Sequence, residues 1–114
     1  MNIIQDKRPW GGEEILTMNE KTTVKILTVN PGQRCSLQYH KHRKEFWEVI
    51  EGELTLEIGD KKIDAKVGDK FEVEPLTKHR LGGKDKQARI LEISFGKFDE
   101  KDITRLEDDY GRIK

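Results

Sequence analysis

Two short glycine-bounded segments of the chain contain all three of its histidines. Among the side chains with metal-binding lone pairs, residues 32–52 hold the closely spaced Gln38, His40, His42 and Glu45, and residues 68–83 hold His79. Imidazole nitrogens and carboxylate oxygens are common ligands of divalent transition metals. Residues two apart on a strand face the same side, so Gln38, His40 and His42 share a face if one strand runs straight through them. The spacing predicts a metal site built from several strands.

Each candidate ligand also has a purely structural interpretation. One buried histidine is more often a hydrogen-bonded core residue than a ligand, but two histidines and a glutamate at matched spacing favour a metal. Gln38 either binds the ion directly or orients a metal-bound water. His42 is a spare ligand, an acid–base group or a surface residue in a charged turn, and these readings stay open. The ligand set suits Zn²⁺, Fe²⁺, Mn²⁺, Co²⁺ or Ni²⁺ equally well.

The elements that must position these residues are short strands. Turn residues recur about every ten positions without a convincing amphipathic helix between them, which predicts an all-β antiparallel sandwich or barrel. Strands are expected at residues 23–29, 34–40, 46–51, 54–58, 63–67, 71–73 and 90–95. The tail differs, because residues 99–110 are compatible with a short helix that has Asp99 as its N-cap and stops at Gly111.

Strand parity assigns directions to the residues that follow Glu45. Trp47 shares the parity of Glu45 and should point inward, where it would wall the cavity. Glu48 shares the opposite parity with Phe46 and Ile50, which argues against Glu48 as a catalytic base.

Composition limits the partners of the chain. Its 114 residues predict one domain, residues 1–114, with 33% apolar and 39% charged residues. Lysine and arginine total 22, as do aspartate and glutamate, and no basic stripe is found, so nucleic acid is not an expected partner. No apolar run approaches the ~20 residues that cross a bilayer. The single Cys35 suits a reducing cytoplasm, where we expect the protein.

The two glycine-bounded segments resemble the paired motifs of the cupin superfamily. Gly32, Gln38, His40, Glu45 and Gly52 satisfy every gap of the first motif, with glutamine where cupins usually have histidine. In the second motif three residues fall at cupin spacing: Gly68, His79 and Gly83. The resemblance implies a double-stranded β-helix, or jelly-roll barrel, with its core at about residues 20–97, and it favours direct metal ligation by Gln38.

Within the cupins the chain is most similar to type II mannose-6-phosphate isomerases, which also occur as the C-terminal part of bifunctional guanylyltransferases. The matching stretches are RPWG at 8–11, residues 31–52, HRL at 79–81 and ITRLEDDYGR at 103–112. The likeness implies interconversion of mannose 6-phosphate and fructose 6-phosphate, with zinc as the preferred ion. No glycine-rich nucleotide loop is found, so guanylyl transfer is not expected. Phe46 and Glu48 depart from the family pattern.

The resemblance assigns provisional roles around the metal ligands Gln38, His40, Glu45 and His79. His42 is the candidate base, because it is near the ligands and histidine titrates near neutrality. Three cations beside the ligands would hold the phosphate: Arg43, Lys78 and Arg80. Trp47 would wall the substrate cavity, and Arg8 would reach its mouth or a dimer contact.

Two other functions and one assembly state also follow from the sequence. A metal-bearing module that binds sugar phosphates without turnover would explain the departures at Phe46 and Glu48. An iron-dependent oxygenase is the third reading, because one fold hosts many chemistries. A homodimer is expected, because small barrels often pair through a sheet edge and residues 34–40 carry an apolar alternate face, Cys35, Leu37 and Tyr39.

Overall fold

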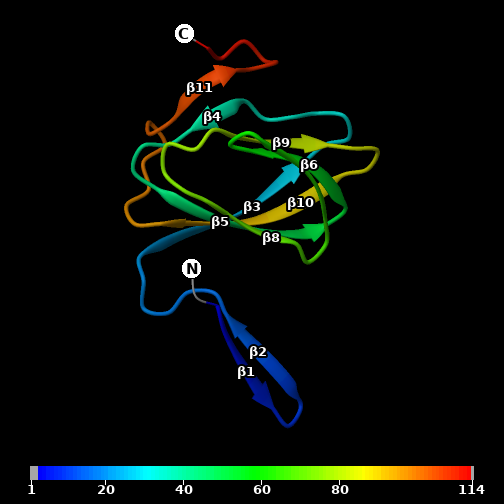
Figure 1. Ribbon diagram of the computed structural model, residues 1–114, viewed down its shortest axis with the longest axis vertical. Helices are drawn as coiled ribbons and strands as arrows, with labels where there is room; N and C mark the ends of the chain where they lie inside the picture. The colour runs from blue at the N-terminus through cyan, green and yellow to red at the C-terminus, as the bar shows by residue number, and fades with distance from the viewer. Residues whose placement is uncertain (1–2, 114) are drawn as a thin grey trace.

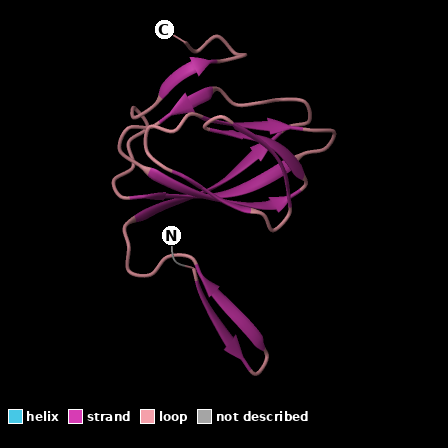
Figure 2. Ribbon diagram, in the orientation of Figure 1, coloured by secondary structure: helices cyan, strands magenta, loops and turns pink. Residues whose placement is uncertain are grey.

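The computed structural model describes residues 3–113, which consist of strands, turns and loops (Figure 2). The strands of this part of the chain are β1 (Ile4–Arg8), β2 (Gly11–Ile15), β3 (Thr22–Val29), β4 (Leu37–Tyr39), β5 (Lys44–Glu51), β6 (Glu53–Ile58), β7 (Lys61–Lys66), β8 (Lys70–Val73), β9 (His79–Gly83), β10 (Ala88–Phe95) and β11 (Thr104–Glu107). The all-β prediction is confirmed. Within residues 3–113 there is no helix of the length and hydrophobicity needed to span a bilayer.

Two antiparallel sheets form the barrel (Figure 1). One sheet has the strand order β3-β10-β5-β8, and the other has the order β11-β4-β9-β6-β7. Their facing sides share one apolar core, to which Trp47 and Ile90 contribute from the first sheet and Leu56 and Leu81 from the second. These side chains are almost fully buried, so the polar residues that also point inward lie beside an apolar core.

The β6–β7 hairpin follows the sequence prediction. Ile58 pairs with Lys61, so Gly59 and Asp60 form a two-residue turn. Gly59 has φ 60°, the left-handed conformation that such hairpin turns require. Gly52, which ends the first motif, has φ 69°, and a Cβ there would lie 2.6 Å from the carbonyl oxygen of Gln87. Close backbone approach therefore explains this motif glycine.

The predicted C-terminal helix over residues 99–110 is wrong. Asp99 accepts a hydrogen bond from the backbone N–H of Lys101, but this closes only a turn. The chain then extends as β11, in which Thr104 pairs with Tyr39 of β4. Pairing with the otherwise open edge of β4 satisfies more backbone groups than a short isolated helix would. The sheet consequently continues past residue 97, the expected end of the barrel core.

The N-terminal residues form a separate β1–β2 hairpin that projects away from the two larger sheets (Figure 1). It contributes to a long molecular axis of 52 Å against 33 and 22 Å for the other two. Glu14 of the hairpin forms an ion pair of 3.6 Å with Lys70 of β8. Most hairpin residues are exposed, including Trp10 at its turn. Sequence analysis did not predict this element.

Candidate metal centre

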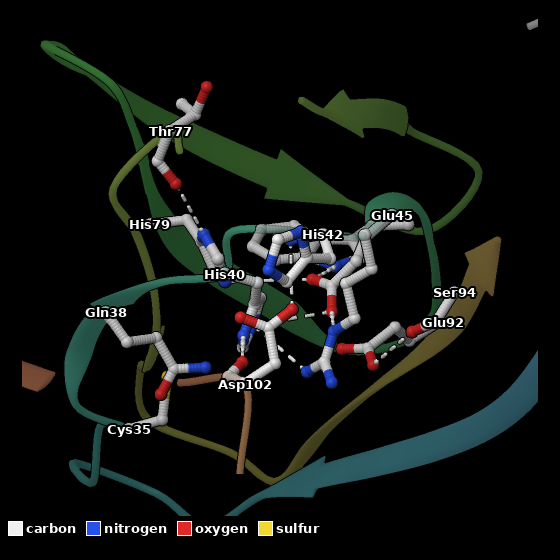
Figure 3. Close-up of polar contacts among 12 residues, drawn as sticks. Cys35, Gln38, His40, His42, Glu45, Thr77, His79, Glu92, Ser94 and Asp102 are labelled. Carbon is white, nitrogen blue, oxygen red and sulfur yellow. Dashed lines mark hydrogen bonds and ion pairs between the residues drawn. The ribbon is translucent and has the colours of Figure 1, made fainter. Parts of the chain in front are cut away.

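Three of the predicted ligands meet inside the barrel. His40 directly follows β4, Glu45 lies in β5 and His79 begins β9. The Nε2 atoms of His40 and His79 lie 3.6 and 3.7 Å from the two carboxylate oxygens of Glu45. Their side chains are 1–3% exposed, and Figure 3 shows the two imidazoles turned toward the Glu45 carboxylate. Two ligands about 2.1 Å from a tetrahedral ion would be about 3.4 Å apart, so these distances suit a shared ion.

Backbone carbonyls set the tautomer of both imidazoles. Nδ1 of His40 donates to the carbonyl oxygen of Asp102 at 2.6 Å, and Nδ1 of His79 donates to that of Thr77 at 2.9 Å. Each Nε2 then carries a lone pair, which is the form that binds metals. Burial lowers the pKa of both histidines, although the carbonyl bonds and the Glu45 charge partly oppose it. Both rings are therefore held neutral.

The donor set fits a divalent cation. Nε2 of His79 is buried and has no hydrogen-bond partner among the described residues, a costly state for a polar atom that a bound ion would relieve. The ligand atoms of His40, Glu45 and His79 all lie within 4.8 Å of one another. Two imidazoles and one carboxylate, without a thiolate, accommodate several first-row metals.

Arg43 and Trp47 fix the carboxylate of Glu45. Nε of Arg43 donates to Glu45 at 3.0 Å, and its NH2 nitrogen donates to Nε2 of His40 at 3.1 Å. Nε1 of Trp47 donates to the other Glu45 oxygen at 3.3 Å, and the indole meets the ring of His79 edge-on at 5.4 Å. Both side chains therefore lie where sequence analysis expected them, beside the ligands.

Gln38 lies at the border of this group. It is the register partner of His79 across the β4–β9 pair, and its amide oxygen accepts a hydrogen bond from Ser36 at 2.5 Å. Figure 3 shows its amide beside the imidazoles, on the side of Cys35. Ligation by Gln38 stays a prediction.

His42 does not share the inward face, because β4 ends at Tyr39. A turn follows in which the backbone N–H groups of Lys41 and His42 both donate to the carboxylate of Asp102, at 2.8 and 3.0 Å. The His42 side chain is exposed. The condition under which His42 would share the inward face, a strand that runs straight through it, is therefore not met.

Arg80 is buried but committed to structural contacts. Its Nε donates to the carbonyl oxygen of Cys35 at 3.0 Å, and its NH1 nitrogen donates to the Glu107 carboxylate at 3.2 Å. Arg80 follows His79 in β9, so the two side chains point to opposite faces of the sheet. The structure does not bring Arg80 to the ligand group.

Lys78 and Arg8 lie outside the ligand group as well. Lys78 is 45% exposed and forms an ion pair with Asp60 at 3.4 Å. Arg8 belongs to the projecting hairpin, where it pairs with Asp6 at 2.9 Å and with Glu13 at 3.6 Å. Neither residue lines the cavity beside the ligands.

A cavity of about 510 Å³ opens beside the ligand group. Its lining includes His79, Gln38, Arg43 and Trp47. It also includes four charged residues that sequence analysis missed: Lys25, Glu92, Glu100 and Arg105. Nε of Arg105 is buried without a hydrogen-bond partner within residues 3–113. For Glu92 a signal existed, since a lone carboxylate interrupts the apolar run of residues 90–95. No sequence signal pointed to Arg105, because its segment was expected to be helical.

Glu92 is a buried carboxyl group on the inner face of β10. It is 6% exposed and accepts a long hydrogen bond of 3.5 Å from the Ser94 hydroxyl. Burial and, next, the negative charge of Glu45 raise its pKa to about 7, against the opposing effect of Arg43 and Lys25. Figure 3 shows its carboxylate pointing from β10 toward the ligand group.

Comparisons with known proteins agree with this picture. Residues 3–108 match the model of a family described as Mannose-6-phosphate isomerase C-terminal. The alginate biosynthesis protein AlgA of Pseudomonas aeruginosa is 38% identical over 107 residues, which cover 92% of this chain and 22% of AlgA. The mannose-1-phosphate guanylyltransferase ManC of Salmonella typhimurium is 35% identical over 111 residues, which cover 93% and 22%. The chain thus spans less than a quarter of these relatives.

A solved structure shows the same fold at low sequence identity. Oxalate decarboxylase from Bacillus subtilis superposes with a TM-score of 0.70 and 22% identity, over 76% of this chain and 24% of that chain. This likeness concerns the fold alone, and it agrees with the predicted cupin barrel.

Proposed function

Because the chain belongs to the family of mannose-6-phosphate isomerase C-terminal domains, we propose that it interconverts mannose 6-phosphate and fructose 6-phosphate with a bound divalent cation. The observation that carries the proposal is the convergence of His40, Glu45 and His79 on one point beside a cavity. Both histidines are neutral, as ligands must be. Nε2 of His79 has no hydrogen-bond partner within residues 3–113, while Nε2 of His40 accepts from Arg43.

The cation, with zinc as the preferred choice, would be held by these three side chains, with Gln38 as a fourth ligand. When bound, it would supply Lewis-acid polarisation of the sugar oxygens at C1 and C2. Arg43 and Trp47 hold the carboxylate of Glu45 in place through their hydrogen bonds. The apolar barrel core excludes water behind the ligands, which strengthens electrostatic interactions within the cavity.

The phosphate of the sugar would be bound by cations of the cavity wall. Arg43, Lys25 and Arg105 all line the cavity, whereas Lys78 and Arg80 do not. The buried Nε of Arg105 offers an unused donor, and a guanidinium binds phosphate oxygens in a forked geometry. Remote binding energy of this kind orients the reacting carbons.

Two of the departures from the family pattern do not touch the cavity. Phe46 is buried on the outer side of β5, away from the core cluster. Glu48 shares that side and forms an ion pair with Lys70 at 3.8 Å. These positions therefore supply no argument against catalysis, and we favour an enzyme over a non-catalytic sugar-phosphate binding module.

The test is an isomerase assay on purified protein freed of metal and reloaded with Zn²⁺, Mn²⁺ or Co²⁺ in turn. We expect interconversion with at least one ion, loss of metal and activity in His40→Ala, and retention of both in His42→Ala. Absence of turnover with every ion would sink the isomerase proposal. Binding of the sugar phosphate without turnover would then support a binding module, and co-purified iron with oxygen uptake would support an oxygenase.

We also propose that the protein forms a homodimer. The outer face of the β3-β10-β5-β8 sheet exposes Val24 and Ile26 at 57% and 51%, and the isolated hairpin exposes Trp10 at 73%. A two-stranded hairpin is marginally stable on its own. A second copy is the partner we favour, because a two-fold dimer lets each chain cover the other's apolar face and hairpin at once. Light scattering at micromolar concentration should give twice the mass of 13.3 kDa, and a monomer would refute the proposal.

A further inference from the structure

We propose that Glu92 is the general base that moves the proton between C1 and C2 of the sugar. This inference rests on the proposed isomerase function and replaces His42 in that role. It is carried by the position of Glu92, whose buried carboxylate lines the same cavity as His79 and Arg43.

The sheet register fixes where Glu92 stands. Glu92 of β10 pairs with Trp47 of β5 on one side and with Lys25 of β3 on the other. Ser94 pairs with Glu45 in the next inward-facing row, so Glu92 is the diagonal neighbour of the ligand Glu45. Diagonal neighbours on a sheet face are about 7–8 Å apart. This separation leaves room for a carbon–oxygen unit of the sugar, with its oxygen at the ligand group and its hydrogen toward Glu92.

The charges that face Glu92 come from each neighbouring strand. Lys25 of β3 and Arg43, at the entry to β5, are positive, while Glu45 of β5 is negative. Lys25 and Arg43 also both contact the ring of Phe98, at 4.1 and 4.6 Å. With burial and Glu45 raising its pKa to about 7, Glu92 can both accept and return a proton near neutral pH.

Other cavity residues are less suited to this step. Burial raises the pKa of the Cys35 thiol, which keeps it protonated. Arg43 is a guanidinium and does not act as a base. Glu45 is used as a ligand, and Glu100, although it lines the cavity, is exposed.

The proposed step balances as follows on the open-chain aldose. A Glu92 oxygen takes the proton from C2, the C2–H electron pair becomes the C1=C2 double bond, and the carbonyl pair of C1 moves onto O1. The hydroxyl proton of O2 then passes to O1. Glu92 returns its proton to C1 while the carbonyl forms at C2, which gives the ketose and restores the carboxylate.

The experiment compares wild type with Glu92→Gln and with the control Glu48→Gln, which changes a glutamate outside the cavity. Metal content by elemental analysis and mannose 6-phosphate binding by calorimetry report on the ligand group and cavity. Turnover and exchange of the C2 proton with deuterated water, followed by NMR, report on the base. We expect Glu92→Gln to retain metal and to bind the sugar within about threefold, while turnover and exchange fall about 10³-fold. Glu48→Gln should resemble wild type.

Glu92→Asp and the pH profile separate a base from a structural residue. The aspartate variant should recover part of the activity, and the rise of wild-type activity with pH near 7 should follow the titration of the Glu92 carboxyl measured by ¹³C NMR. If wild type turns over and Glu92→Gln does so within tenfold, Glu92 is not the base. If wild type binds the sugar but moves its C2 proton neither to C1 nor to solvent, no base acts on the sugar, and Glu92 is not the base. If wild type does not bind the sugar, the isomerase proposal itself fails.

Discussion

The barrel interior and the projecting β1–β2 hairpin use charged residues in opposite ways. Inside the barrel, Arg43, Glu45 and Glu92 are at most 9% exposed. In the hairpin, Asp6 and Arg8 pair at 2.9 Å while both remain nearly half exposed. Buried charges are costly and need a compensating partner or ligand, whereas exposed pairs contribute about 0–1 kcal/mol. Each buried charge therefore needs compensating contacts, which Arg43 and Glu45 give each other and which Arg80 finds in Glu107 and the carbonyl of Cys35.

The largest effect should come from removing the buried ligand charge. Glu45→Gln retains the size of the side chain but supplies a weaker, neutral ligand, so we expect metal occupancy to fall below a tenth and isomerase activity to fall at least ~10³-fold. Glu48→Gln, on the outward face of the same strand, is the matched control and should keep both. Elemental analysis measures the metal occupancy, and the isomerase assay measures the activity. Full metal occupancy in Glu45→Gln would show that the buried carboxylate of Glu45 is no more important for metal binding than the outward carboxylate of Glu48.

A second effect concerns the cavity cation against a surface cation. Arg105→Met removes a cavity guanidinium whose buried Nε has no hydrogen-bond partner within residues 3–113. Loss of a charged hydrogen bond to the phosphate costs about 1.5–3 kcal/mol, which is ten- to a hundredfold in affinity. Lys78→Met should change sugar-phosphate affinity less than twofold, because Lys78 lies at the surface. Calorimetric titration with mannose 6-phosphate measures the affinity of each variant. Equal losses in both variants would show that burial does not select the phosphate-binding residue.

The stability of the metal-free protein should depend on the Glu92 carboxyl. Its pKa of about 7 in the folded state lies above the ordinary 4.5, so the folded protein holds a proton that the unfolded chain releases. Stability from this group is therefore present below pH 4.5 and is lost as pH rises through 7. Glu92→Gln should reduce the loss between pH 5 and 8 by an amount on the order of 2 kcal/mol. Urea unfolding of both proteins at pH 5 and pH 8 measures this difference. Equal losses of stability in wild type and in Glu92→Gln would contradict the prediction.

The smallest effect is expected in the hairpin. Arg8→Ala removes two exposed ion pairs and should change the free energy of unfolding by less than about 0.5 kcal/mol. Metal content should not change. A loss of metal in this variant would mean that the hairpin reaches a metal site, which the geometry of a single chain does not show.

The convergence of His40, Glu45 and His79 was predictable because strand periodicity and spacing constrain these candidate ligands. Glu45 and Trp47 lie two residues apart in β5 and so face the same side. His40 follows β4 and His79 begins β9, and both of these strands belong to the opposite sheet. The sequence left several readings of His42 open, because the end of β4 at Tyr39 depends on the turn tied to Asp102, a contact between residues about sixty positions apart. Local patterns do not contain such long-range contacts.

The cavity wall was harder to foresee than the ligands. Arg105 reaches the cavity through β11, and β11 forms because β4 offers an open edge. The local sequence of that segment also fits a helix, so tertiary pairing decided the outcome. Lys25 and Glu92 share a row across β3 and β10, a register that can be read only once the strand order is known.

The most direct test of the account is anomalous X-ray scattering from a crystal of the protein loaded with Zn²⁺. The account predicts one peak per chain at about 2.0–2.2 Å from Nε2 of His40, from Nε2 of His79 and from a carboxylate oxygen of Glu45. A zinc-loaded crystal with no peak between these three side chains, or with its peak elsewhere on the chain, would contradict it.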